Sequence, residues 1–125
     1  MDSRKLALLC RELADNKKAE EIVVLDVREL STVTDYFVIA SGTSEPHLRA
    51  ISEEITDKLR EEYEFRPRAV DGTVQGGWLV LDFFDVIAGV DHHSFARGLV
   101  ADDGTVALQG ANGNDFVNHV DIVGD

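Results

Sequence analysis

Hydrophobic residues recur along much of the chain with the spacing of helices and strands. Near the N-terminus they fall at i, i+3, i+4 and i+7, which is one stripe of a helix that Ser3 can cap. A second stripe follows Pro46, a residue tolerated in a first helical turn, so a helix is predicted from Thr43 or Ser44 to about Glu62. The two stripes consist of Leu6, Leu9, Cys10 and Leu13, and of Leu48, Ile51, Ile55 and Leu59.

Apolar and β-branched runs between and after these helices predict strands. Residues 21–27 are almost continuously apolar, as expected of a strand covered on both faces, and residues 35–41 form a second strand. Because their link is too short for a crossover, we expect the two to pair antiparallel. A short third strand within residues 65–72 should lie at a sheet edge, since Pro67 has no N–H group. Residues 78–90 predict one long, central strand that is apolar on both faces.

The end of the chain, residues 91–125, has a different composition, with five glycines, six aspartates and one basic residue. An Asp-Gly pair predicts a hairpin turn, and weak strands are expected at 98–101, 105–109 and 116–123. We therefore predict an α/β (α+β) domain over residues 1–90, in which helices flank a mixed sheet. The Gly- and Asp-rich segment should pack on the same domain.

Composition narrows the classes of function. A net charge of −12 repels nucleic-acid phosphates and anionic lipids and attracts basic partners, although acidity also serves solubility alone. No apolar run is long enough to cross a membrane, and the N-terminus lacks a signal-peptide pattern. Cys10 is the only cysteine, which excludes a disulfide within the chain and a four-thiolate zinc site. We expect a cytoplasmic protein without membrane contact or direct sequence-specific binding of nucleic acid.

The loop Ser41–Ser44 lies between a predicted strand and a predicted helix, where phosphates often bind. A phosphate loop has several glycines followed by a lysine, whereas this one has a single glycine and no lysine before Lys58. The nearest paired carboxylates, Asp82 and Asp85, are spaced i, i+3 and would point to opposite faces of a regular strand, which does not suit a shared metal site. We predict a strand end and helix cap, and no enzyme or cofactor. A nucleotidyltransferase-like enzyme that binds a nucleotide at this loop is the alternative.

Two further groups could carry chemistry. His92 and His93 could share a metal only in a loop, with Asp91 or His119 as further ligands, and ordinary loop histidines are the simpler interpretation. Cys10 falls on the apolar stripe of the first helix, where a cysteine usually behaves as a small core residue. Neither group indicates a catalytic site.

Three segments, residues 17–44, 47–51 and 76–87, together resemble the Iojap-like family of ribosomal silencing factors. The most specific part is the run D-Y-F-V-I-A-S-G-T-S, followed at the family's distance by G-x-W-x-x-x-D-x-x-D-V. The resemblance implies a fold related to nucleotidyltransferases but without their catalytic site. It also implies binding to the large ribosomal subunit through large-subunit ribosomal protein fourteen, which blocks subunit joining and represses translation. Members of the family commonly form homodimers when free.

The resemblance also singles out positions that could contact the partner. Trp78 is the natural anchor, since tryptophan is enriched at binding hot spots, but it could equally be a core residue at a strand start. The family usually continues with V-V-H-x-F and a terminal helix, whereas here Gly89 stands at the histidine position and the helix pattern is absent. A dimeric scaffold that has lost ribosome binding is therefore a further alternative. The other signature positions are Asp35, Tyr36, Ser41, Gly42, Thr43, Arg49, Asp82 and Asp85.

Overall fold

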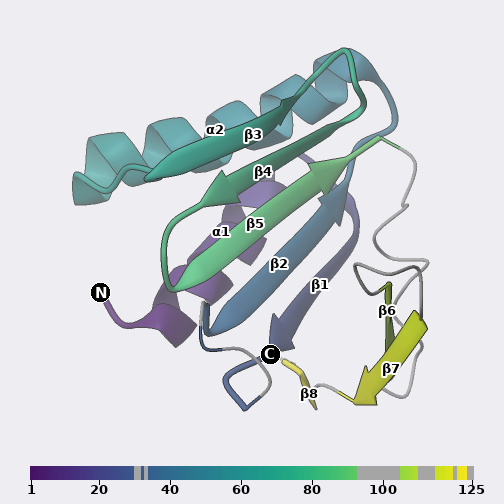
Figure 1. Cartoon of the computed structure of the whole chain (residues 1–125). Helices are drawn as coiled ribbons and strands as arrows, with labels where there is room; N and C mark the ends of the chain where they lie inside the picture. The colour runs from purple at the N-terminus through teal and green to yellow at the C-terminus, as the bar shows by residue number, and fades with distance from the viewer. Residues whose placement is uncertain (30–31, 33, 93–104, 110–114, 120, 124–125) are drawn as a thin grey trace.

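Two helices cover one face of a mixed, six-stranded sheet in the computed structural model (Figure 1). The structure describes residues 1–29, 32, 34–92, 105–109, 115–119 and 121–123. The helices are α1 (Ser3–Asn16) and α2 (Glu45–Tyr63). In sheet order, the strands are β3 (Ala69–Thr73), β4 (Trp78–Asp82), β5 (Val86–Asp91), β2 (Tyr36–Ser41), β1 (Glu20–Asp26) and β8 (Asp121–Ile122). A separate antiparallel pair is formed by β6 (Thr105–Gln109) and β7 (Asp115–His119).

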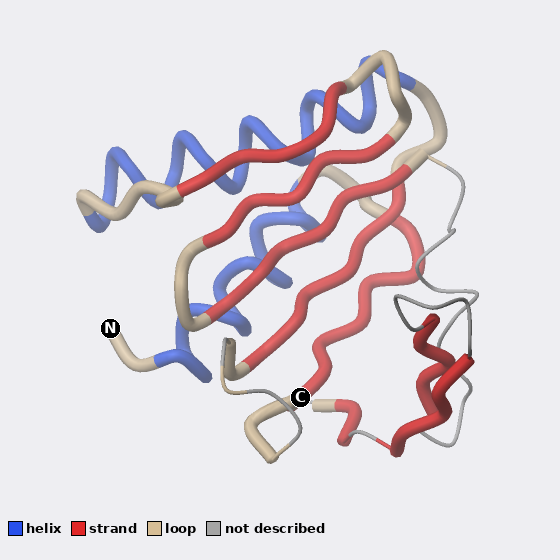
Figure 2. The backbone as a smooth tube through the Cα atoms, viewed as in Figure 1, coloured by secondary structure: helices blue, strands red, loops and turns tan. Residues whose placement is uncertain are grey.

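The short β8 lies beside β1 at one edge of the sheet, and the other five strands follow one another as neighbours except at the centre of the sheet. There β2 pairs antiparallel with β1 and parallel with β5, and the chain between β2 and β5 forms α2, β3 and β4 (Figure 2). The predicted antiparallel pairing of the first two strands, the edge position of the third and the mixed α/β fold are therefore confirmed. No helix in the described part of the chain is long and apolar enough to cross a membrane.

The prediction of one long strand over residues 78–90 is wrong. The chain reverses after Asp82 and returns as β5, which pairs antiparallel with β4. The Asp82 side chain makes this turn possible, because its Oδ1 accepts the Phe84 N–H at 2.9 Å. Apolar residues flank the turn and no glycine or proline marks it, so the sequence reads as continuous strand.

The helix starts depend on side-chain caps. Asp2, and not the predicted Ser3, caps α1 by accepting the Lys5 N–H at 2.8 Å. Ser44 caps α2 as predicted, accepting the His47 N–H at 3.2 Å, and α2 ends one residue beyond the predicted Glu62.

Of the strands expected in the tail, the one at 105–109 is confirmed as β6. The one expected at 116–123 is in fact two, β7 and the short β8, and β8 pairs with β1 at the far edge of the sheet. The strand expected at 98–101 and the Asp-Gly turn lie outside the described residues.

The main core lies between the helices and one face of the sheet. Alternate residues along each strand point to opposite faces, so one set meets the helices and the other lies on the opposite, open face. Burying each large aliphatic side chain of this core contributes roughly 1.5–3 kcal/mol. The core includes Leu6, Leu48, Ile51, Ile55 and Leu59 from the helices and Tyr36, Val38, Ala40, Val86, Ala88 and Val90 from the sheet.

The open face carries no described helix and is also largely apolar. A second buried cluster covers its β1 side. Over β4 and β5, Val80 and Ile87 remain half buried, and Trp78 is 48% exposed. The helix layer thus leaves the β4–β5 half of the open face accessible. The second cluster consists of Val23, Leu25 and Val27, with Phe37 and Ile39 packed against it.

Cys10 is fully buried in the main core, as its place on the apolar stripe predicts. Burial raises the pKa of its thiol from 9.0 to about 12, because the thiolate would lose its hydration. The side chain is therefore a neutral core residue at physiological pH.

We predict that Cys10 in the folded protein reacts with a chromogenic disulfide reagent at least ~100-fold more slowly than in guanidinium-unfolded protein, since only an accessible thiolate is nucleophilic. Absorbance of the released thiol measures the rate. Cys10→Ser serves as the blank, and equal rates in the two states would contradict the burial.

Candidate functional site

The sheet register separates the signature residues into two groups at opposite ends of the strands. At one end, Trp78 on β4 lies opposite Asp91 on β5, and Asp91 lies opposite Ser41 on β2. Gly42 and Thr43 follow Ser41, so this group forms what we call the Trp78 end. The other group, the Asp82 end, lies about 17 Å away, the length of a five-residue strand. It contains Asp35, Tyr36, Asp82 and Asp85.

Arg49 belongs to neither group. It is exposed on α2 and lines a shallow depression at the start of that helix. The structure therefore places the signature positions on three separate surfaces.

The open face is hollowed at the Trp78 end. A cavity of about 520 Å³ is lined by residues 75–80 and 89–92. Gly89 lines the cavity, and a Cβ at this position would meet no atom within 4 Å. Trp78, half exposed, forms one wall, so it is neither a core residue nor fully free of the fold.

Two glycines of the β3–β4 hairpin fix the position of the Trp78 indole. A Cβ at Gly72 would lie 2.8 Å from the indole Cε3, and one at Gly76 would lie 3.9 Å from Nε1. The ring therefore rests against the hairpin backbone.

The loop Ser41–Ser44 is held by hydrogen bonds within the protein. Gly42 N–H donates to the Asp91 carbonyl at 2.7 Å, and Ser41 Oγ donates to Asp91 Oδ1 at 2.6 Å. Thr43 N–H donates to Nδ1 of His47 at 2.9 Å. The predicted strand end and helix cap are confirmed, and the N–H groups of Gly42 and Thr43 are already bonded to the protein.

His47 connects this loop to the end of α1. Since its Nδ1 accepts from Thr43, Nε2 carries the proton and donates to the Lys17 carbonyl at 2.7 Å. Sequence reasoning placed His47 in the helix but gave it no role, because its partner Lys17 is 30 positions away in the sequence.

Asp91 and His92 are site residues that sequence reasoning considered only as metal ligands. In the structure Asp91 is a buried residue of the Trp78 end. His92 Nε2 lies 3.2 Å from the Thr43 carbonyl oxygen. Within the part of the chain that the structure describes, no group of three or more His, Cys, Asp or Glu side chains could hold a metal ion. His93 and the side chain of His119 lie outside that part.

At the Asp82 end, the carboxylate of Asp82 supports the fold. Its Oδ2 accepts from Arg68 Nε at 3.1 Å, and its Oδ1 accepts the Phe84 N–H. The expectation that Asp82 and Asp85 lie on opposite faces of one regular strand is wrong, because a turn separates them.

Backbone contacts join the start of β2 to the same turn. The Asp85 carbonyl accepts N–H groups from Asp35 at 2.8 Å and from Tyr36 at 3.2 Å, and the Tyr36 side chain is fully buried. Tyr36 is therefore a core residue.

Nearby, a hydrogen bond from the Arg28 guanidinium lowers the pKa of the Asp26 carboxyl group.

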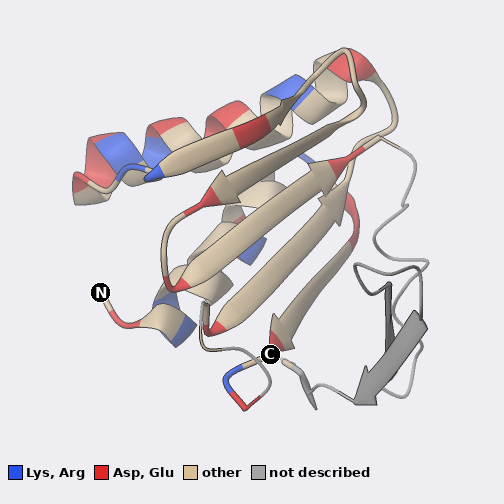
Figure 3. Cartoon of the chain, viewed as in Figure 1, with Lys and Arg blue, Asp and Glu red and all other residues tan. Residues whose placement is uncertain are grey.

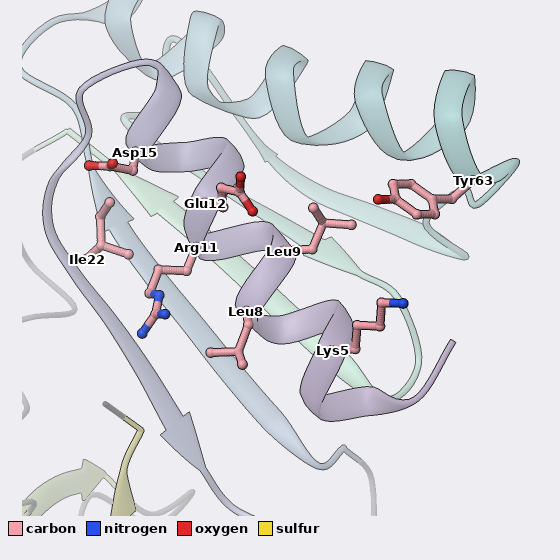
Figure 4. A pocket seen from close by; sticks show the side chains of 8 residues that line it. All are labelled: Lys5, Leu8, Leu9, Arg11, Glu12, Asp15, Ile22 and Tyr63. Carbon is pink, nitrogen blue, oxygen red and sulfur yellow. The ribbon is translucent and has the colours of Figure 1, made fainter. Parts of the chain in front are cut away.

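The larger cavity of the described residues lies elsewhere. A groove of about 780 Å³ extends over the outer side of α1. Figure 4 shows Leu8 and Arg11 on one side of α1 and Leu9, with Tyr63 of α2, on the other. The lining residues therefore lie on both sides of an exposed helix. None of the signature positions lines the groove, and its lining carries two basic and two acidic side chains. Its lining is Lys5, Leu8, Leu9, Arg11, Glu12, Asp15, Ile22 and Tyr63.

Comparison with known proteins supports one family. The model of a family described as "Ribosomal silencing factor during starvation" matches residues 1–94. The ribosomal silencing factor of Halalkalibacterium halodurans is 33% identical over 92 residues, covering 74% of this chain and 78% of that protein. The one of Bacillus subtilis is 32% identical over 92 residues, covering 74% and 77%. A crystal structure of a protein from Bacillus halodurans is 32% identical, with a TM-score of 0.64, and the match covers 71% of this chain and 82% of that one.

These similarities confirm the resemblance that the three sequence segments predicted. The structural match also confirms the mixed α/β fold class.

We predict that His47→Ala lowers the free energy of unfolding by about 1–3 kcal/mol, because it removes two hydrogen bonds and leaves the Thr43 N–H without its acceptor. Chemical denaturation followed by circular dichroism measures the loss. Arg49→Ala, two positions further along the same helix on an exposed site, is the control and should change stability by less than about 0.5 kcal/mol. Equal effects of the two substitutions would show that His47 does not hold the loop.

Proposed function

Because the chain belongs to the family of ribosomal silencing factors, we propose that it binds the large ribosomal subunit and sterically blocks its association with the small subunit. Translation is repressed as a result. We propose large-subunit ribosomal protein fourteen as the direct partner, as the family resemblance implies. The protein acts in the cytoplasm by occupying a surface, without catalysis and without a cofactor.

The observation that carries this proposal is the half-exposed Trp78 beside an open hollow. Exposed tryptophans next to a pocket are frequent anchors of protein interfaces, since one large, rigid side chain supplies much contact area. The β3–β4 glycines fix the indole before the partner arrives, which lowers the entropy lost on binding. The hollow above Gly89 accepts a side chain of the partner.

The distribution of charge favours the same surface. Figure 3 shows acidic residues along the helices and at strand ends, whereas the middle of β4, β5 and β2 carries none. With a net charge of −12, the molecule attracts a basic ribosomal protein but is repelled by ribosomal RNA. An uncharged, apolar centre allows contact close to RNA phosphates without burying unpaired carboxylates.

We also propose that the free protein forms a homodimer. The half-buried apolar side chains on the β4–β5 half of the open face support this, because such surfaces favour association with a second copy. Residues 1–90 form the family domain, and residues 91–125 are a segment packed on it. The pairing of β8 with β1 supports that arrangement.

The alternative of a nucleotide-binding enzyme receives less support. The loop that would bind the phosphates already uses the N–H groups of Gly42 and Thr43 in bonds to Asp91 and His47. A phosphate that used these two N–H groups would have to break their present bonds.

We predict that Trp78→Ala weakens co-sedimentation with purified large subunits about 10- to 30-fold, as expected for a binding hot spot. Tyr63→Ala is the matched control, because Tyr63 is a similarly exposed aromatic residue on the other layer of the molecule. Melting temperatures establish that both variants are folded. Absence of the wild type from the pellet at micromolar concentration would favour the scaffold alternative.

A second variant fills the hollow instead of removing Trp78 from its wall. Gly89→Val should leave the melting temperature unchanged or raise it, because the added side chain enters open space and valine favours strands. It should nevertheless weaken large-subunit binding at least ~10-fold by occupying the partner's place. Unchanged binding in the same sedimentation assay would show that the partner does not use the hollow.

A further inference from the structure

The turn between β4 and β5 places a phenylalanine in an unfavourable backbone conformation. Asp85 N–H donates to the Phe83 carbonyl two residues earlier at 3.1 Å, which closes a γ-turn. Phe84, at its centre, has φ of 80°. This is the rare, strained form of the γ-turn, and glycine would adopt it at a lower cost than a residue with a side chain.

Burial does not offset this strain. The Phe84 ring is 58% exposed, more than any other large hydrophobic side chain in the described residues. Its neighbour Phe83 is 2% exposed and meets the ring of Phe65 with centroids 5.9 Å apart. Phe83 therefore completes the core, and the fold makes no comparable use of Phe84.

The exposed ring is nevertheless held in place. Asp82 accepts the Phe84 N–H with one carboxylate oxygen and Arg68 Nε with the other. The Arg68 guanidinium carbon lies 4.5 Å from the centroid of the Phe84 ring, within cation–π range. These contacts orient the ring and leave most of it facing solvent. We call Arg68, Asp82, Phe84 and Asp85 the Phe84 corner.

The charge of the surroundings indicates the kind of partner. Arg68 and Asp82 form an ion pair, so their two charges cancel. Exposed Asp85, and Asp35, whose N–H donates to the Asp85 carbonyl, add two carboxylates at the same end of the sheet. The corner therefore combines an aromatic ring with negative charge, a combination that attracts a cationic side chain.

We propose that the Phe84 corner binds an arginine or lysine side chain of a basic protein, which stacks on the part of the ring that Arg68 leaves exposed and pairs with the carboxylates of Asp85 and Asp35. With the large subunit as target, this rests on the proposed function and adds a second contact to that of Trp78. Trp78 begins β4 and Phe84 lies in the turn just after it, so the two aromatics are separated by at least the distance from the first to the last residue of that strand, about 13 Å.

Phe84→Gly tests the proposal, because it removes the ring and relieves the backbone at once. We expect its melting temperature to rise by about 2–5 °C, and its affinity for large subunits in co-sedimentation to fall about 3- to 10-fold. Phe84→Tyr keeps an aromatic ring and should bind as the wild type does. Wild-type affinity of the glycine variant would overturn the proposal.

A second measurement does not depend on the ribosome. A short peptide of alternating glycine and arginine is titrated into the labelled protein, and the amide signals of residues 82–86 are followed by NMR. We expect shifts centred on this turn in the wild type and in Trp78→Ala, but not in Phe84→Gly or with a glycine–glutamate peptide. Such shifts without ribosome binding by the wild type would refute the proposed function alone. Shifts centred elsewhere, or a response to an RNA oligonucleotide and not to the peptide, would overturn the corner as a site for basic protein.

Discussion

The parallel pairing of β2 with β5 is the contact on which the rest of the molecule depends. Its register sets Tyr36 opposite Val86 and Ser41 opposite Asp91, so the inward residues of both strands meet the same helices. A shift by one residue would turn Val86 and its alternate neighbours onto the open face and expose the core. The same shift would separate Ser41 from Asp91. The stability of the core thus also fixes the surface proposed for docking.

The sequence predicts most helices and strands, but not which residues the pairing of the strands brings together. Helical spacing identifies α1 and α2, and a short link suffices to pair β1 with β2. The turn at Asp82 is missed because it relies on a side-chain hydrogen bond and a strained phenylalanine within an apolar run. The grouping of Trp78 with Asp91 cannot be predicted from one sequence, since it depends on the register of two non-local pairings. Family membership follows from the resemblance, whereas the docking surface is proposed from the exposure of Trp78 and the hollow beside it.

An exposed apolar surface favours unspecific association, so its retention needs a physical reason. On the β1 side, the second cluster buries such residues within the protein. On the β4–β5 side the hollow at Gly89 remains, although a larger residue would fit. The fold therefore tolerates a better filled surface at this point. Stability alone does not account for the open space, whereas the proposed insertion of a partner side chain would.

The two exposed aromatics at either end of β4 should act together. Strand pairing on both sides holds β4 rigid, so Trp78 and Phe84 keep a fixed separation. When Trp78 has docked, contact at the Phe84 corner becomes an intramolecular step, and its weak attraction multiplies the affinity without a second loss of translational freedom. If Trp78 and Phe84 were joined by a flexible segment, most of this gain in affinity would be lost. The strained turn is then understandable, because it fixes the ring at the point where the rigid strand ends.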